Sequence, residues 1–381
     1  GQRPRLERRA ARAWERFKAE LPHQRGDYAK RNWGHPLHSL CSYQGKMKPS
    51  LAHHLVKTFV PAGGRVLDVF GGTGTIPFEA ALAGAKAWSF DISPAAHHIS
   101  SAKLGRHDAG ACERLMDALE DYLRANEVSA PELAAAGEIK FNGPLPDYFA
   151  PETFGEVLLA RRYFRERPPH TPSESLVFAS LLHVLHGNRP YALSRRSHPI
   201  TPFAPTGAAE YRPLLKSLRD KVRRSLELEY PAGFVPGAAV VQDATAWWPQ
   251  EVNSLDAVIT SPPFFDSTRF YLANWMRLWF CGWESASFKT QPMAYVDERQ
   301  KAGFEIYDPV FRQARERLKT GGVFVLHLGQ SRKCDMAQAL RERAGRWFRA
   351  LDLFSESVGH CESHGIRDKG TVTSHQYLIL S

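Results

Sequence analysis

The chain has 381 residues, of which 43% are hydrophobic and 24% are charged. These proportions are ordinary for a folded globular protein and exclude intrinsic disorder as the default state. The length suits one large domain with an insertion, or two domains. No window of about 18 apolar residues occurs, and no apolar signal-peptide core stands near the first residue, so we expect a cytoplasmic protein without a membrane span.

The formal net charge of +10 favours a polyanionic partner. Residues 1–50 hold twelve lysines and arginines against four acidic residues. Further basic clusters occur at 161–167, 189–196 and 216–224. Any one cluster is equally well explained as a solvated helix face. Together they favour nucleic acid, and Arg195 and Arg196 are the candidate phosphate contacts.

The cysteines favour a reduced protein. They are widely spaced, with no C-x-x-C pair, and fit free thiols better than disulfides or a structural zinc. The five are Cys41, Cys112, Cys281, Cys334 and Cys361. We therefore expect no metal.

The first regular elements form a β-loop-α-β unit. Residues 65–70 read as a buried strand, 71–74 as a glycine loop and 75–83 as a helix. A second strand follows over 85–90 and ends at Asp91. Units of this kind build a parallel sheet with helices on both faces.

The same pattern resumes after residue 236. Strands are predicted at 238–244, 255–261, 321–329, 351–355 and 371–381. Helices are predicted at 269–281, 308–318 and 335–348. With the first two strands this makes seven, so we predict an α/β fold with a Rossmann-like seven-stranded sheet.

A largely helical insertion is predicted between the second and third strands. It contains helices at 112–127 and 210–229, with the loop 189–207 between them. Specificity usually resides in segments inserted into a rigid scaffold. We therefore expect the insertion to contribute to target recognition.

The loop "DVFGGTGT" has the features of a ligand site. Gly71, Gly72 and Gly74 let a ligand approach the backbone at the start of a helix. Pro77 stands where a dinucleotide fingerprint needs a small residue, and a phosphate-loop Gly-Lys-Ser/Thr is absent. Asp91, at the end of the next strand, is placed to accept both hydroxyls of a ribose. A nucleoside without a pyrophosphate fits best.

Asp243 follows the third predicted strand as Asp91 follows the second. Sheet geometry puts it near the same crevice. An ordinary turn-forming or helix-capping aspartate is the alternative explanation.

The stretch "TSPPF" follows the fourth strand and permits two interpretations. Proline has no N–H to close a turn, so two consecutive prolines make a stiff corner that exposes their carbonyls. A rigid corner between strand and loop is by itself a sufficient structural explanation. Beside a nucleoside site, the Ser261 hydroxyl and the Pro262 carbonyl can accept both protons of an exocyclic amino group. Phe264 can then stack on the base, worth roughly 1–3 kcal/mol.

These motifs together resemble the S-adenosylmethionine-dependent DNA amino-methyltransferases that modify cytosine N4 or adenine N6. The glycine loop D-x-F-x-G-x-G/T of that family is matched at Asp68, Phe70, Gly72 and Gly74. Its [S/N/D]-P-P-[Y/F] tetrapeptide is matched at Ser261, Pro262, Pro263 and Phe264. The segment upstream of the glycine loop is similar as well. In the family this segment closes over the methionine part of the cofactor, and its residues correspond here to Lys46, Met47 and Pro49. The resemblance covers 40–104 and 238–381.

The resemblance implies S-adenosylmethionine as cofactor, with Asp91 on the ribose and Asp243 on the adenine amino group. Their neighbours Gly71, Ile92 and Ala244 are included in the implied cofactor site. It also implies a catalytic domain made of 46–104 and 237–381, after a basic segment 1–45 and around an inserted recognition region 105–236.

Ser261 as the first residue of the tetrapeptide is similar to the cytosine-N4 branch, so transfer to a flipped-out cytosine of DNA is the expected reaction. An RNA base and adenine N6 are alternatives, as is a nucleic-acid-binding protein without catalysis. A cognate restriction endonuclease is an implied partner. The chain departs from the family pattern at Phe264, where tyrosine is commoner, and in the site of its insertion.

Overall fold

The computed structural model describes residues 5–198, 201–265, 270–357 and 372–381. Its centre is a seven-stranded sheet with the order β3-β2-β1-β4-β5-β7-β6. The strands are β1 (Arg65–Asp68), β2 (Lys86–Asp91), β3 (Ala238–Val241), β4 (Leu255–Thr260), β5 (Leu318–Ser331), β6 (Ala350–Ser357) and β7 (Val372–Leu380). Strand β7 runs antiparallel to β5 and β6, and the other pairings are parallel. The predicted Rossmann-like α/β class is therefore confirmed.

Helices cover both faces of this sheet because successive strand residues point to opposite sides. Val66 packs into a cluster with α1, α2 and α3, whereas Leu67 packs into another with α14 and α15. Helix α4 lies against β2 and β3. The bounds are α1 (Arg8–Glu20), α2 (Pro49–Phe59), α3 (Thr75–Leu82), α4 (Pro94–Leu104), α14 (Asp308–Arg317) and α15 (Met336–Ala344).

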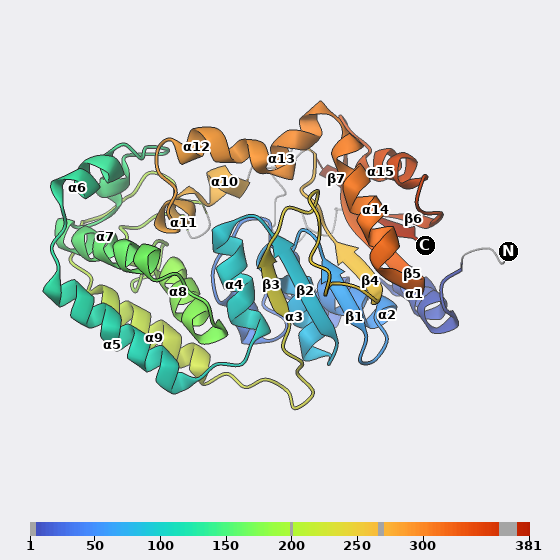
Figure 1. Ribbon diagram of the computed structural model, residues 1–381, viewed down its shortest axis with the longest axis horizontal. Coiled ribbons are helices and arrows are strands. Elements are labelled where there is room, and N and C mark those ends of the chain that lie inside the picture. The colour runs from blue at the N-terminus through green and yellow to red at the C-terminus, as the bar shows by residue number, and fades with distance from the viewer. Residues whose placement is uncertain (1–4, 199–200, 266–269, 358–371) are drawn as a thin grey trace.

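The insertion between β2 and β3 is largely helical, as predicted. It comprises α5 (Ala109–Ala125), α6 (Ala130–Gly137), α7 (Pro151–Glu166), α8 (Pro172–Val184) and α9 (Leu214–Leu226). These helices gather on one side of the molecule beside α4 (Figure 1), and α8 packs directly against α4.

Helix α11 (Trp275–Phe280) belongs to the same hydrophobic cluster as the insertion, although it follows β4 in the chain. The Arg277 guanidinium donates to the carbonyl of Leu182 in α8 at 3.1 Å. The insertion and the segment after the S-P-P-F corner therefore share one core. The domain boundaries at 105 and 236 stay predictions.

The single helix predicted over 269–281 is wrong. In the described part, α10 (Phe270–Ala273) ends at Asn274, whose backbone departs from helical angles and whose side-chain amide donates to the Phe270 carbonyl at 3.0 Å. The backbone N–H of Asn274 donates to the same carbonyl at 2.9 Å, so the interruption lies in the backbone angles of this one residue. The short helices α12 (Ser287–Thr290) and α13 (Val296–Arg299) then lead the chain back toward the sheet (Figure 1).

Helix α1 is anchored in the fold. Trp14 and Phe17 are buried and pack against Phe59 and Tyr377. The Trp14 indole also donates to the Asp352 carboxylate at 2.9 Å. Helix α1 of the basic N-terminal segment is therefore part of the cover of the sheet.

We predict that Trp14→Ala lowers the free energy of unfolding by about 3–5 kcal/mol, because it removes a buried indole and leaves a cavity beside the sheet. Arg12→Ala on the exposed side of the same helix is the matched control and should change it by less than about 0.5 kcal/mol. Urea titration monitored by circular dichroism measures both. Equal stability of the two variants would contradict the anchoring role of α1.

Candidate active site

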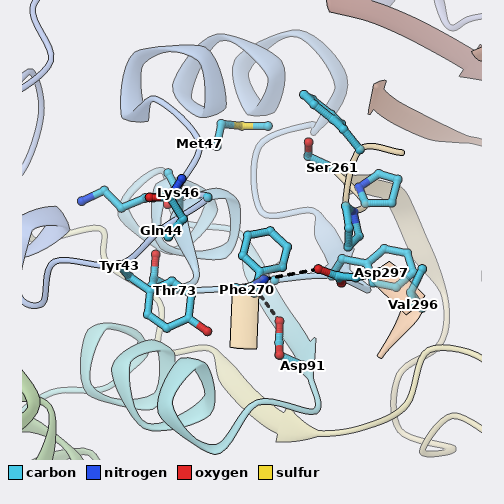
Figure 2. Close-up of a pocket in the computed structure, with 18 of the residues that line it drawn as sticks. Tyr43, Gln44, Lys46, Met47, Thr73, Asp91, Ser261, Phe270, Val296 and Asp297 are labelled. Atoms are coloured by element: carbon cyan, nitrogen blue, oxygen red, sulfur yellow. Dashed lines mark hydrogen bonds between the residues drawn. The ribbon is translucent and has the colours of Figure 1, made fainter. Parts of the chain in front are cut away.

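A cavity of about 820 Å³ opens at the carboxyl ends of β1, β2 and β4 (Figure 2). Fourteen residues named from the sequence line it: Lys46, Met47, Asp68, Phe70, Gly71, Gly72, Asp91, Ile92, Asp243, Ala244, Ser261, Pro262, Pro263 and Phe264. The remaining four, Pro49, Gly74, Arg195 and Arg196, do not line it. The glycine loop and the S-P-P-F corner, almost 200 residues apart, thus share one cavity.

The glycine loop lies tightly against the end of β2. A Cβ at Gly71 would stand 1.7 Å from the Ser89 hydroxyl oxygen, so no larger residue fits there without rearrangement. Gly74 is the N-cap of α3 and has a φ of +79°, a left-handed conformation that favours glycine. These two glycines hold the loop in place around Gly72 and Thr73, which line the cavity.

Asp91 is held by the backbone. Its two carboxylate oxygens accept the N–H groups of Gly72 at 3.0 Å and Ser93 at 2.8 Å. Each oxygen keeps a further lone pair for a ligand. Burial raises the pKa of Asp91 to about 6, despite these hydrogen bonds. The carboxylate is therefore ionised at neutral pH, and it lines the cavity with its oxygens held by the backbone.

Asp68 ends β1 on the same edge. One of its oxygens accepts the Thr260 hydroxyl at 2.6 Å and the Phe70 N–H at 3.0 Å. Burial raises its pKa to about 7. Asp68 thus joins the glycine loop to the last residue of β4, immediately before the S-P-P-F corner.

Asp243 forms a local turn. It accepts the backbone N–H of Thr245 at 2.8 Å and the Thr245 hydroxyl at 2.7 Å, and it lies 3.4 Å from Arg299. Asp243 therefore has the turn-forming role that the sequence offered as one explanation. Asp243 also lines the cavity, so both interpretations are compatible at this position.

The S-P-P-F corner is held by a chain of two hydrogen bonds. The Pro263 carbonyl accepts the Gln300 side-chain amide at 3.0 Å, and Gln300 in turn accepts the Tyr307 hydroxyl at 2.8 Å. The Pro262 carbonyl receives no hydrogen bond from any residue in the described ranges. The corner is rigid, and one of its acceptors is unused within that part of the chain.

Phe264 is packed against Gly329 of β5. A Cβ at Gly329 would lie 2.7 Å from the phenylalanine ring, so the glycine creates the space that the ring fills. The rings of His327 and His375 are 5.7 and 5.8 Å away between centroids. The ring is therefore held by the ends of β5 and β7 at the cavity wall.

Several cavity residues were not found from the sequence. Tyr43, Gln44, Thr73, Val296, Asp297 and Phe270 are drawn with the site in Figure 2. Burial raises the pKa of Asp297 to about 6, and nothing in its local sequence marks it. His327 had a signal, because it is a polar residue inside the apolar run "VFVLHL" of a buried strand.

The insertion reaches the cavity through His198, Thr201 and Phe203. The loop that carries them is held at its base, where the Ser197 N–H donates to the Gly187 carbonyl at 3.1 Å. Asn142 also donates to the Pro202 carbonyl at 2.7 Å. One wall of the cavity therefore comes from the inserted region.

The basic clusters of the insertion are largely engaged within the protein. Arg195 donates to the Gly207 carbonyl at 2.9 and 2.7 Å, and also to the Asp147 carbonyl. Arg219 contacts three carboxylates within 3.1 Å. Arg196 is exposed. Arg8, Arg12 and Arg16 of α1 also face solvent, which makes that helix the better candidate for phosphate.

Among the described residues, no group of three His, Cys, Asp or Glu side chains is placed to hold a metal ion, and Cys361 lies outside them. No helix in those ranges is long and apolar enough to cross a membrane.

Neither a protein-family model nor a curated protein matches the chain. Solved structures with some likeness include a TehB-like SAM-dependent methyltransferase from Corynebacterium glutamicum, with a TM-score of 0.31 and 10% identity over 87% of this chain and 86% of that one. An rRNA methylase from Streptococcus thermophilus gives 0.34 and 10%, over 88% and 97%. The rRNA methyltransferase aviRa from Streptomyces viridochromogenes gives 0.34 and 13%, over 90% and 88%. Likeness this low assigns neither substrate nor site residues.

We predict that Gly71→Ala destabilises the protein by about 1–3 kcal/mol, because the added methyl overlaps the Ser89 hydroxyl. The double variant Gly71→Ala/Ser89→Ala should recover most of that loss, since the overlapping oxygen is gone. Thermal unfolding of the four proteins in this double-mutant cycle measures the coupling. Additive effects would show that the loop does not lie against β2 as described.

Proposed function

We propose that this chain is an S-adenosylmethionine-dependent methyltransferase that modifies the exocyclic amino group of a nucleic-acid base, cytosine N4 of DNA in the first instance. One observation carries the proposal: the glycine loop with Asp91 and the S-P-P-F corner open into the same cavity. A nucleoside-binding loop and a pair of rigid acceptors for an amino group are the two halves that this reaction needs.

The cavity residues fit the cofactor. Asp91 has lone pairs left for ribose hydroxyls. The Thr73 hydroxyl is buried, lines the cavity and has no hydrogen-bond partner among the described residues, so a polar ligand group would complete it. Lys46 and Met47 lie across the cavity from Asp297 (Figure 2). When bound there, the cofactor supplies an electrophilic methyl group on a sulfonium.

The S-P-P-F corner would orient the target nitrogen. An aromatic amino group is a poor nucleophile because its lone pair is delocalised into the ring. When Ser261 and the Pro262 carbonyl accept its two protons, the nitrogen is held toward tetrahedral geometry and its lone pair can face the methyl group. Once the methyl has been transferred, the amino proton is strongly acidic, so no strong base is required.

The substrate must reach this buried corner, which for a base in a duplex requires extrusion from the stack. The exposed arginines of α1 offer a surface for phosphates. His198 and Phe203 place part of the insertion at the cavity wall, which supports a target-recognition role for the region 105–236. The same arrangement would serve a single-stranded RNA base, which needs less extrusion.

We predict that affinity for S-adenosylmethionine falls as the pH drops through about 6, because protonation of Asp91 removes an acceptor for the ribose. Asp91→Asn should bind on the order of tenfold more weakly at pH 8 and lose this dependence. Titration calorimetry between pH 5 and 8 measures it. Asp68→Asn is the comparator, because Asp68 also lines the cavity and has a raised pKa. If the pH dependence of cofactor affinity disappears in Asp68→Asn but persists in Asp91→Asn, Asp91 is not the ribose acceptor.

We predict that Ser261→Ala slows methyl transfer roughly tenfold or more while cofactor affinity stays nearly unchanged, because the lost interaction is made mainly in the transition state. Single-turnover rates and cofactor binding are measured on the same protein. If Ser261→Ala transfers the methyl group at the wild-type rate, the S-P-P-F tetrapeptide has only a structural role.

A further inference from the structure

The Ser261 hydroxyl has two contacts with one residue. Its oxygen lies 3.0 Å from the backbone carbonyl oxygen of His327 and 3.0 Å from the Nδ1 of the same imidazole. The sheet register produces this arrangement. Thr260 of β4 pairs with Leu326 of β5, so the next residue of each chain segment, Ser261 and His327, come level with each other.

These two contacts determine where the protons lie. A backbone carbonyl can only accept, so the single Ser261 proton is donated to it. The contact with Nδ1 is then a hydrogen bond only if Nδ1 carries a proton and donates to the serine oxygen. The opposite tautomer would leave the serine and carbonyl oxygens 3.0 Å apart with no proton between them. The two bonds together therefore require the Nδ1–H imidazole.

The rest of the imidazole agrees with a neutral ring. His327 is 5% exposed, and its Nε2 has no hydrogen-bond partner among the described residues. Burial lowers the pKa of His327 well below its usual value, so the ring stays uncharged.

The ring is also fixed in orientation. It contacts His375 edge-on at 5.0 Å between centroids and Tyr377 at 5.2 Å. Tyr377 is anchored in turn, because its hydroxyl donates to the buried carboxylate of Glu356 at 2.5 Å. A rotation of His327 that released Ser261 would have to displace these neighbours.

We propose that His327 is a positioning residue that makes Ser261 an obligate hydrogen-bond acceptor, so that the cavity selects a base presenting an amino N–H and rejects one presenting a carbonyl. This inference rests on the proposed function and names the chemical feature by which that function chooses its target. Cytosine or adenine has the required donor, whereas uracil or hypoxanthine has an oxygen in its place.

The selection for an amino group follows from the number of hydrogen bonds that the Ser261 hydroxyl can make. The Ser261 oxygen has two lone pairs and one proton. The proton goes to the His327 carbonyl and one lone pair receives Nδ1–H, which leaves a single lone pair for the cavity that Ser261 lines. An amino N–H can donate to it. A carbonyl oxygen would face that lone pair and remain unsatisfied in a buried site, which is unfavourable. Without the imidazole, the carbonyl of residue 327 can still accept the hydroxyl proton, but no Nδ1–H donor holds the Ser261 oxygen, so the side chain can turn and offer its proton to the cavity.

The tautomer is tested directly on the unmodified protein by ¹⁵N NMR of histidine-labelled chain. Spectra of His327→Phe identify which of the 16 histidine signals belongs to this residue. We expect a neutral ring with Nδ1 protonated and Nε2 unprotonated. A protonated Nε2, or exchange between the two forms, would overturn the inference. This readout is independent of methyl transfer, so it separates failure of the inference from failure of the proposed function.

Selection is tested by competition, with an oligonucleotide containing the sequence that the wild type methylates and a matched one with a carbonyl in place of the target amino group. We expect the wild type to prefer the amino form on the order of tenfold or more, and His327→Phe to lose most of that preference. His327→Asn should restore part of it, because its amide can donate to Ser261 from a position close to that of Nδ1. An unchanged preference in His327→Phe, or no difference between the two variants, would contradict the proposal.

Discussion

The parallel pairing of β1 with β2 and β4 is the constraint on which the site depends. Val66 pairs with Ala257 and Asp68 pairs with Ser89, so three strands end at nearly the same level of the sheet. The residues that follow them converge there, because parallel strands present their carboxyl ends to one edge. The Thr260–Asp68 hydrogen bond of 2.6 Å then ties the glycine loop to the S-P-P-F corner. The glycine loop and the S-P-P-F corner cannot move apart without breaking this buried contact.

Much of this arrangement could be predicted because its signals are local in the sequence. The glycine loop, the S-P-P-F corner and Asp91 each follow a short apolar run, and the run itself identifies the strand that positions them. Alternation of strands and helices is enough to predict the α/β class and the seven strands. Whether Asp91, Ser261 and their neighbours bind what the resemblance implies stays a prediction.

Other features depend on which residues meet in space, and the sequence carries little information about that. Arg195 and Arg219 read as free positive charge, but their guanidinium groups contact carbonyls and carboxylates of neighbouring segments. Asp297 reaches the cavity from the short helix α13 and Phe203 from a loop of the insertion, and neither directly follows a strand. The break at Asn274 consists of non-helical backbone angles at one residue, which helix periodicity does not reveal.

The most direct test of the proposed function is transfer of a labelled methyl group from S-adenosylmethionine. The purified chain is incubated separately with unmethylated DNA and with RNA, each polymer is digested, and the labelled nucleosides are separated and identified. We expect the label on an exocyclic amino nitrogen, in N4-methylcytosine of DNA. Label on an amino nitrogen of RNA alone would show that the substrate is RNA instead of DNA, with the same amino-methyl transfer. Label on a ring carbon, or no labelled nucleoside in either polymer, would refute the proposed function.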